Sequence, residues 1–431
     1  MLTVPFLTDL DSRAAIKGSR DPLGIQPIWT RFGRQVVGNL TTVSNSVRDF
    51  TSLLLGYYFV ERLADEDGVA SDVDTFLKWE QIAAYARAGI NDDWGMRGTE
   101  RVKKNLSEDS RVTISANASN QILGNQKIYG LWGLYTMPAR ASALIAGEPS
   151  RLTPHALELV ESVYLPKLKK GAGREAKAIC AILKEESRVI DLRGRDAAWM
   201  KSVAEVLKTN LSETEREFYR EQVFFGGPND PTDGRQKQLA AFVEATLTES
   251  DFKWSPLAVG ALVKEATASG EGHHALGDRL NRIHIAECVL APASVLFSHL
   301  LGTDGRTTDF VINRLKDAWG DGLRSIDNVG FRDLRGEISA GVPEVGERWA
   351  ETANALAFGD YGKVLELLIA QNADVMKQRS GAPWIEMRRG KLHVRFRDEQ
   401  GSLPGADDLP TLWRFNYFLE SLRDIAWWLR T

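Results

Sequence analysis

The chain has 431 residues, of which 43% are hydrophobic and 26% charged, and its net charge is −4. This length allows two to four domains with buried cores, and the composition excludes wholesale disorder. The two cysteines, Cys180 and Cys288, are far apart in sequence, which excludes a disulfide framework and a zinc knuckle and suits a reducing cytoplasm.

Nothing in the sequence predicts a membrane segment. The N-terminal stretch has an acidic residue by Asp9 and lacks an apolar core of signal-peptide length. The longest apolar run, 53–60, is too short to cross a bilayer. We therefore expect a cytoplasmic protein with no membrane partner.

Hydrophobic periodicity predicts a mainly α, multi-helical protein. Residues 21–63 carry apolar side chains at helical spacing, which indicates two helices or one broken near Gly38. An acidic, loop-like stretch follows at 65–74. A helix over 73–88, a basic helix over 97–108 and an alternating strand over 111–115 come next. Farther on, a capping box at Ser212 and Glu215 predicts a helix start, and further helices are expected over 235–249 and 274–301.

Residues 128–162 read IYGLWGLYTMPARASALIAGEPSRLTPHALELVES. We expect a short helix capped at 136–138 that runs to Ile145, then a tight loop at 147–149 and a strand-like piece at 150–152. A new helix opens at Thr153 and Pro154.

The order of helix, basic helix, strand, helix, short loop and helix across 73–165 resembles a winged helix-turn-helix module. This resemblance implies that the loop is the wing and that the helix before it faces DNA or a protein partner. The loop is short for a wing that reaches DNA, and the recognition helix carries Arg140 as its one base-reading or phosphate-binding side chain. A degenerate winged helix that binds proteins is therefore a second interpretation.

Basic residues are concentrated in this region. Residues 95–174 contain twelve Lys and Arg and six Asp and Glu, a net charge of +6, which leaves −10 for the rest of the chain. Such asymmetry is typical of a phosphate-facing module in an acidic body, although a solvated basic surface paired with that body explains it equally well. The residues that we predict to bind the nucleic-acid backbone are Arg97, Arg101, Lys103, Lys104, Lys127, Arg140 and Arg151.

Elsewhere in the chain, the His, Asp, Glu and Lys residues that could serve a catalytic or metal site lack the spacing that such a site requires. His274 with Asp278, and His284 with Glu287, are helical neighbours, but the two pairs are too far apart to share an ion. A nuclease would need a different arrangement of acidic residues and lysine, and the glycine-containing loop 302–306 is not a Walker motif. The candidate groups for a nuclease are Glu386 with Lys391, and Asp304 with Asp309, and both pairs lack the required spacing. We predict no catalytic residue, no metal site and no cofactor.

The C-terminal part is predicted to form a β-hairpin over 384–397, with its turn at 389–391, and a helix over 409–430. The predicted organisation is a helical region (1–72), a winged-helix-like module (73–170), a helical domain (171–376) and a hairpin with a terminal helix (377–431).

In general character the whole chain resembles accessory subunits of bacterial phage-defence or DNA-modification operons. The resulting hypothesis is a non-enzymatic subunit that binds the backbone of duplex DNA and associates with protein partners encoded in the same operon. The alternatives are a protein-interaction scaffold that uses the degenerate winged helix and the C-terminal helix, and a divergent metal-dependent nuclease.

Overall fold

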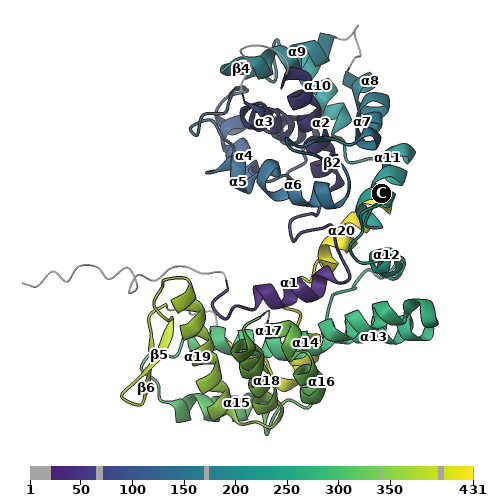
Figure 1. Ribbon diagram of the computed structural model, residues 1–431. Coiled ribbons are helices and arrows are strands. Elements are labelled where there is room, and N and C mark those ends of the chain that lie inside the picture. The colour runs from purple at the N-terminus through teal and green to yellow at the C-terminus, as the bar shows by residue number, and fades with distance from the viewer. Residues whose placement is uncertain (1–20, 65–70, 169–173, 340, 397–401, 431) are drawn as a thin grey trace, which may run out of the picture. The chain divides into compact units, whose positions relative to one another are not determined.

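The computed structural model describes residues 21–64, 71–168, 174–339, 341–396 and 402–430. The first twenty residues, most of the acidic stretch 65–74, residues 169–173 of the basic stretch 95–174, and Arg397 fall outside these ranges. Within them the protein is mainly helical and carries small two-stranded sheets, so the predicted fold class is confirmed at that level (Figure 1).

The chain divides into two compact units, each assembled from segments that are distant in sequence. Unit 1 comprises the described parts of Met1–Val36 and Asp251–Tyr417, and unit 2 comprises those of Val37–Ser250 and Phe418–Thr431.

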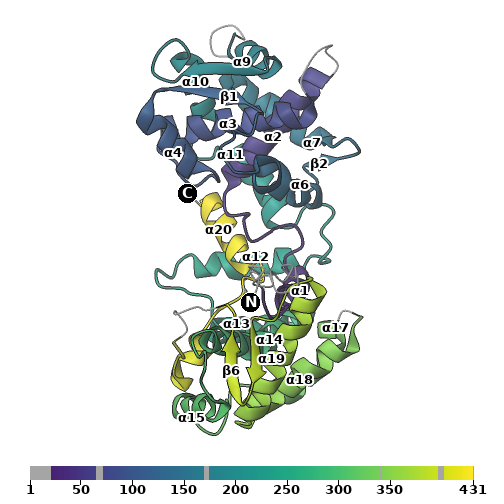
Figure 2. The same ribbon diagram turned by 90° about the vertical axis from the view of Figure 1, so that its left-hand side faces the viewer.

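Unit 2 has α2 and α3 at its centre, and both views show shorter helices around them (Figures 1 and 2). Its helices are α2 (Val47–Ala64), α3 (Asp72–Asn91), α4 (Thr99–Glu108), α5 (Gln126–Tyr129), α6 (Leu131–Ala141), α7 (Pro154–Leu159), α8 (Leu165–Leu168), α9 (Arg174–Lys184), α10 (Ala197–Val206), α11 (Glu213–Tyr219), α12 (Arg235–Thr246) and α20 (Leu419–Arg430). Two π-helical turns, η1 (Val160–Tyr164) and η2 (Arg220–Phe224), continue α7 and α11.

The strands of unit 2 form two separate antiparallel pairs. β1 (Arg111–Ser115) pairs with β4 (Ser187–Asp191), in a register that sets Thr113 opposite Val189. The very short strands β2 (Ile145–Ala146) and β3 (Arg151–Leu152) form a hairpin of their own. The predicted strand 111–115 is β1, and the predicted loop 147–149 lies between β2 and β3, which form a different sheet.

Buried ion pairs hold the central helices of unit 2 together. On α2, Asp49 pairs with Arg87 of α3 and accepts a hydrogen bond from the Tyr135 hydroxyl of α6 at 2.8 Å. Arg87 also pairs with Asp93 at 2.7 Å. Because a charge buried without its partner is strongly destabilising, these contacts fix how α2, α3 and α6 pack.

Unit 1 is built around α14 (His274–Leu300), whose buried side chains run along most of its length. Among the described residues, one helical stretch, Glu271–Leu300, is long enough and apolar enough to cross a bilayer. Its most apolar window is 72% buried inside the protein. The other helices of unit 1 are α1 (Gln26–Arg34), α13 (Pro256–Ala268), α15 (Thr308–Trp319), α16 (Asn328–Asp333), α17 (Arg335–Ser339), α18 (Pro343–Ala357) and α19 (Tyr361–Gln378), with 3₁₀ turns η3 (Glu271–His273) and η4 (Ala406–Thr411).

The predicted C-terminal hairpin is confirmed as β5 (Ile385–Arg388) and β6 (Lys391–Val394). Its two turn residues, Arg389 and Gly390, both have positive φ, as the tight turn of a two-residue hairpin requires. Figure 2 shows β6 near α19, and β5 contacts that helix.

Two predicted helix boundaries are wrong. The helix expected to start at 136–138 begins at Leu131 and places Pro138 in its interior, and it ends at Ala141 because Ile145 joins β2. The terminal helix begins at Leu419, since residues 406–411 form a 3₁₀ turn. Both predictions followed apolar side chains at helical spacing. In these two places that spacing continues beyond the α-helix into a strand or a 3₁₀ turn.

Candidate nucleic-acid interface

The basic helix α4 lies on α3 through few side chains, which leaves most of its surface to solvent. Val102 is its buried residue. Leu106 lies beside Gly89 of α3, where an added Cβ would approach its Cδ1 to 3.1 Å. Arg101, Lys103 and Lys104 of α4 are therefore exposed, and Arg101 and Lys104 share a helical face.

Backbone contacts tie the cations around α4 to the segment that follows β1. The Arg97 guanidinium donates to the backbone oxygen of Tyr129 at 3.0 Å, and Arg101 donates to the backbone oxygen of Gln121. Lys127 is exposed on the short helix α5. Across the described part of the chain, Lys103, Lys104 and Lys127 form no ion pair, so their charges face solvent.

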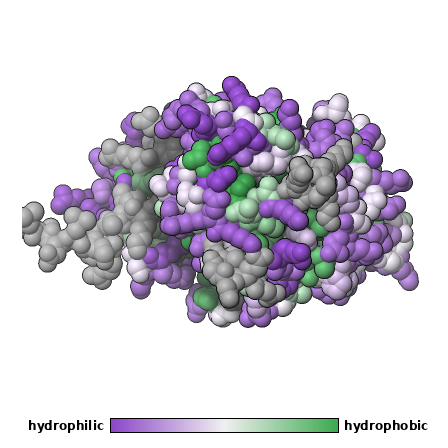
Figure 3. All heavy atoms as spheres, turned by 90° about the horizontal axis from the view of Figure 1, so that it is seen from above, coloured by the Kyte–Doolittle hydropathy of each residue, from purple (hydrophilic) through white to green (hydrophobic). Residues whose placement is uncertain are grey.

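Large apolar side chains are also exposed in unit 2, a feature that the sequence did not predict. The exposed fractions are 39% for Trp94, 53% for Ile128, 55% for Tyr129 and 69% for Met137. On the face drawn in Figure 3, hydrophilic side chains predominate and hydrophobic ones form small groups between them. We use the name α4–α5 surface for Trp94, Arg97, Arg101, Lys103, Lys104, Lys127, Ile128 and Tyr129.

The exposure of Tyr129 has a signal in the sequence. Gly130 ends α5 after four residues, and so short a helix cannot bury both Ile128 and Tyr129 against one neighbour. A surface that carries both cationic and aromatic side chains is suited to phosphate contact and to base stacking.

The remaining predicted cations, Arg140 and Arg151, hold the β2–β3 hairpin. Arg140 donates to the backbone oxygen of Gly147 at 2.9 Å and to the Ser150 hydroxyl at 2.5 Å. Arg151 pairs with Asp72 at 3.1 Å. Both are half-buried, so the structure separates them from the exposed cations of the α4–α5 surface.

Glu80, a fully buried residue of α3, fixes the junction between α5 and α6. Its carboxylate accepts hydrogen bonds from the backbone N–H of Leu131 at 2.7 Å and from the Gln126 side chain at 2.8 Å. A Cβ at Gly130 would lie 2.6 Å from the Glu80 Oε1 atom, so the close approach needs glycine. Burial raises the pKa of Glu80 to about 7 against the opposing effect of these hydrogen bonds. The position of Lys127 and Tyr129 thus depends on a carboxyl group that titrates near neutrality.

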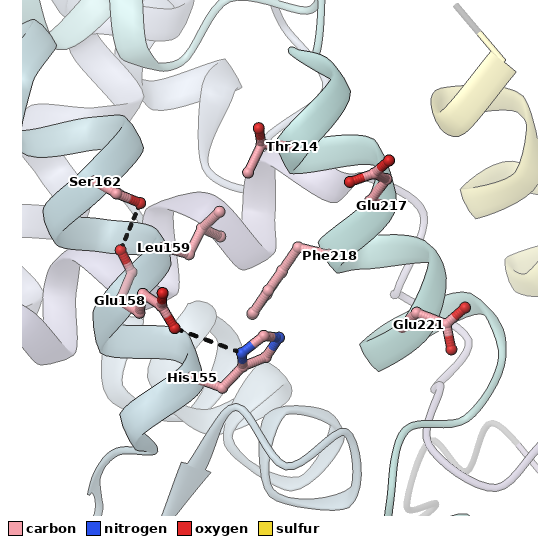
Figure 4. A pocket seen from close by; sticks show the side chains of 8 residues that line it. All are labelled: His155, Glu158, Leu159, Ser162, Thr214, Glu217, Phe218 and Glu221. Atoms are coloured by element: carbon pink, nitrogen blue, oxygen red, sulfur yellow. Dashed lines mark hydrogen bonds and ion pairs between the residues drawn. The ribbon is translucent and has the colours of Figure 1, made fainter.

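Unit 2 also has a cavity of about 330 Å³ between α7 and α11 (Figure 4). The His155 ring stacks on Phe218 with centroids 5.0 Å apart, and Glu158 lies 4.0 Å from the His155 Nδ1 atom. Glu217 and Glu221 also line the cavity. Three carboxylates beside one imidazole repel phosphate, so this cavity is unsuited to a nucleic-acid backbone.

The side chains considered for catalysis have structural partners. Glu287 is buried and accepts hydrogen bonds from the Tyr417 hydroxyl at 2.8 Å and from the backbone N–H groups of Arg414 and Phe415. His284 lies 2.9 Å from the backbone oxygen of Pro256, and Asp278 pairs with Arg282.

The carboxylates considered for a nuclease are engaged in the same way. Glu386 pairs with Arg388 and Arg395, and Asp304 accepts from the backbone N–H of Val394 at 2.9 Å. Within the described ranges, no group of three or more His, Cys, Asp or Glu residues is arranged to hold a metal ion.

Comparisons with protein-family models, with curated proteins and with solved structures found no match to this chain.

Proposed function

We propose that this protein is a non-enzymatic subunit that binds the backbone of duplex DNA through the α4–α5 surface. The observation that carries the proposal is the set of exposed cations on α4 and α5 that form no ion pair with any described residue, together with exposed Trp94 and Tyr129. Its place in a bacterial complex rests on the general resemblance of the sequence to accessory subunits of phage-defence or DNA-modification operons.

The charge pattern favours binding that is independent of base sequence. Lysine and arginine side chains on α4 can neutralise phosphates, whereas Arg140 of the predicted recognition helix donates from its Nη2 atom to the β2–β3 hairpin. The affinity should therefore fall steeply with salt and vary little between duplexes of different sequence.

The test is the salt dependence of duplex binding by the full-length protein, measured by fluorescence anisotropy. If Lys103 and Lys104 each contact a phosphate, K103A/K104A should reduce the slope of log K against log salt by about 2. Lys264→Ala, at an exposed lysine of α13 in unit 1, is the matched control and should leave the slope unchanged. Absence of duplex binding by the wild type at low salt would refute the proposal.

Protein docking is the second function, favoured by the exposed apolar side chains Met137 and Trp427. Trp427 is 55% exposed on α20, whereas Leu422 and Ile425 of that helix are buried. Removal of the whole helix would expose the core of unit 2, so Trp427→Ser is the better test. Loss of a copurifying protein encoded in the same operon, with unchanged duplex binding, would favour docking.

A further inference from the structure

A second basic surface lies in unit 1, where the loop after α14 enters α15. This loop is held by the β5–β6 hairpin: Gly305 donates to the backbone oxygen of Leu392, and Leu392 donates to that of Arg306, both at 2.8 Å. Thr307 then caps α15 through its hydroxyl. The backbone of Arg306 is therefore fixed on both sides.

Phe310 and Arg314 are one turn apart on α15, and Arg306 lies in the loop just before the Thr307 cap. The guanidinium carbons of Arg306 and Arg314 lie 4.9 Å and 5.7 Å from the centre of the Phe310 ring. All three side chains are exposed, and within the described ranges neither arginine forms an ion pair. Two cations and an aromatic ring thus face solvent together.

These side chains line a cavity of about 440 Å³, a size typical of small-molecule sites. Asp317 and Thr303 also belong to its lining. The cavity therefore combines groups that bind phosphate, a ring that can stack, and a carboxylate that can accept a hydrogen bond from a hydroxyl or amino group. Inorganic phosphate would use the arginines and leave the other two kinds of group unused.

We propose that this cavity binds a nucleotide. Arg306 and Arg314 hold the phosphate, the base stacks on Phe310 or on the guanidinium that covers it, and Asp317 accepts from a hydroxyl or amino group. The same chemistry is found in a free mononucleotide and in the terminal nucleotide of a single strand. The site belongs to unit 1, whereas the α4–α5 surface belongs to unit 2.

The experiment is titration calorimetry of the full-length protein with adenosine monophosphate. We expect saturable binding that weakens at least about tenfold in R306A and in R314A, because each loses a charge-assisted contact to phosphate. R306K should also bind more weakly than the wild type, since lysine lacks the guanidinium fork. Lys264→Ala controls for net charge and should bind as the wild type does. No heat of binding at millimolar nucleotide, or equal affinity in R306A, would overturn the proposal.

A 5′-phosphorylated single-stranded oligonucleotide distinguishes the two sources. The Lys391 side chain is exposed, and its backbone pairs with that of Thr307 just before α15, but Lys391 does not line the cavity. If the natural occupant is a strand end, the oligonucleotide should bind more tightly than the mononucleotide, and Lys391→Ala should remove that advantage. If it is a free nucleotide, the two affinities should be alike. In either case K103A/K104A should bind the nucleotide as the wild type does. The proposal for this cavity and the proposal for the duplex interface can therefore be refuted separately.

Discussion

Replacement of Glu80 by glutamine should remove a pH dependence from the stability of unit 2. Burial raises the pKa of Glu80 to about 7, from 4.5 in the unfolded chain. A carboxyl group with a raised folded-state pKa contributes stability that is complete below pH 4.5 and is lost as the pH rises through 7. A shift of this size corresponds to about 3 kcal/mol, of which about 2.5 kcal/mol falls between pH 5 and pH 8.

Glutamine keeps an acceptor for the Leu131 N–H but has no proton to lose. The free energy of unfolding of E80Q minus that of the wild type should therefore increase by about 2.5 kcal/mol from pH 5 to pH 8. Urea denaturation at several pH values, followed by circular dichroism, measures this difference.

Glu287 supplies the control, because burial raises its pKa to about 7 in unit 1. If the two units unfold in separate transitions, E287Q should change the pH dependence of the other transition. A constant difference between E80Q and the wild type across this range would show that Glu80 is not the titrating group.

Three further outcomes are expected from single substitutions. Asp49→Ala should destabilise unit 2 by about 3–5 kcal/mol in urea denaturation, because it leaves Arg87 buried with a missing partner; a loss under about 1 kcal/mol would contradict that role for the pair. Gly130→Ala should cost about 1–3 kcal/mol and weaken duplex binding, whereas Gly124→Ala, whose Cβ would meet nothing within 4 Å, should do neither. Met137→Ser, at an exposed position, should change the unfolding free energy by less than about 0.5 kcal/mol, and a larger loss would mean that this side chain is packed.

Local patterns in the sequence were sufficient for the mainly helical character, for many of the individual helices and for the β5–β6 hairpin. The capping box of Ser212 and Glu215 forms as predicted, because both of its hydrogen bonds lie within four residues. The pairing of β1 with β4 was not predicted, since its partners are far apart in sequence and β4 has no distinctive alternation. The division of the chain into two interleaved units likewise leaves no local signal.

The candidate site was predictable in part. The cations of α4 follow from a run of basic residues on a helix with a single buried position, Val102. The partners of Arg140 and Arg151 could not be predicted, because Asp72 and the backbone of Gly147 reach them through tertiary packing. The buried position of Glu80 was equally hidden, since α3 is enclosed on all sides and shows no polar stripe.

The interleaving of the two units has a consequence for biosynthesis. Helix α20 contacts α12 and buries Leu419, Leu422 and Leu429, yet the ribosome makes it after the whole of Asp251–Tyr417. At about 5–20 residues per second, the apolar surface that α20 covers waits on the order of 10 to 30 seconds for its partner. Nascent unit 2 should therefore be a client of ribosome-associated chaperones until translation reaches the last helix.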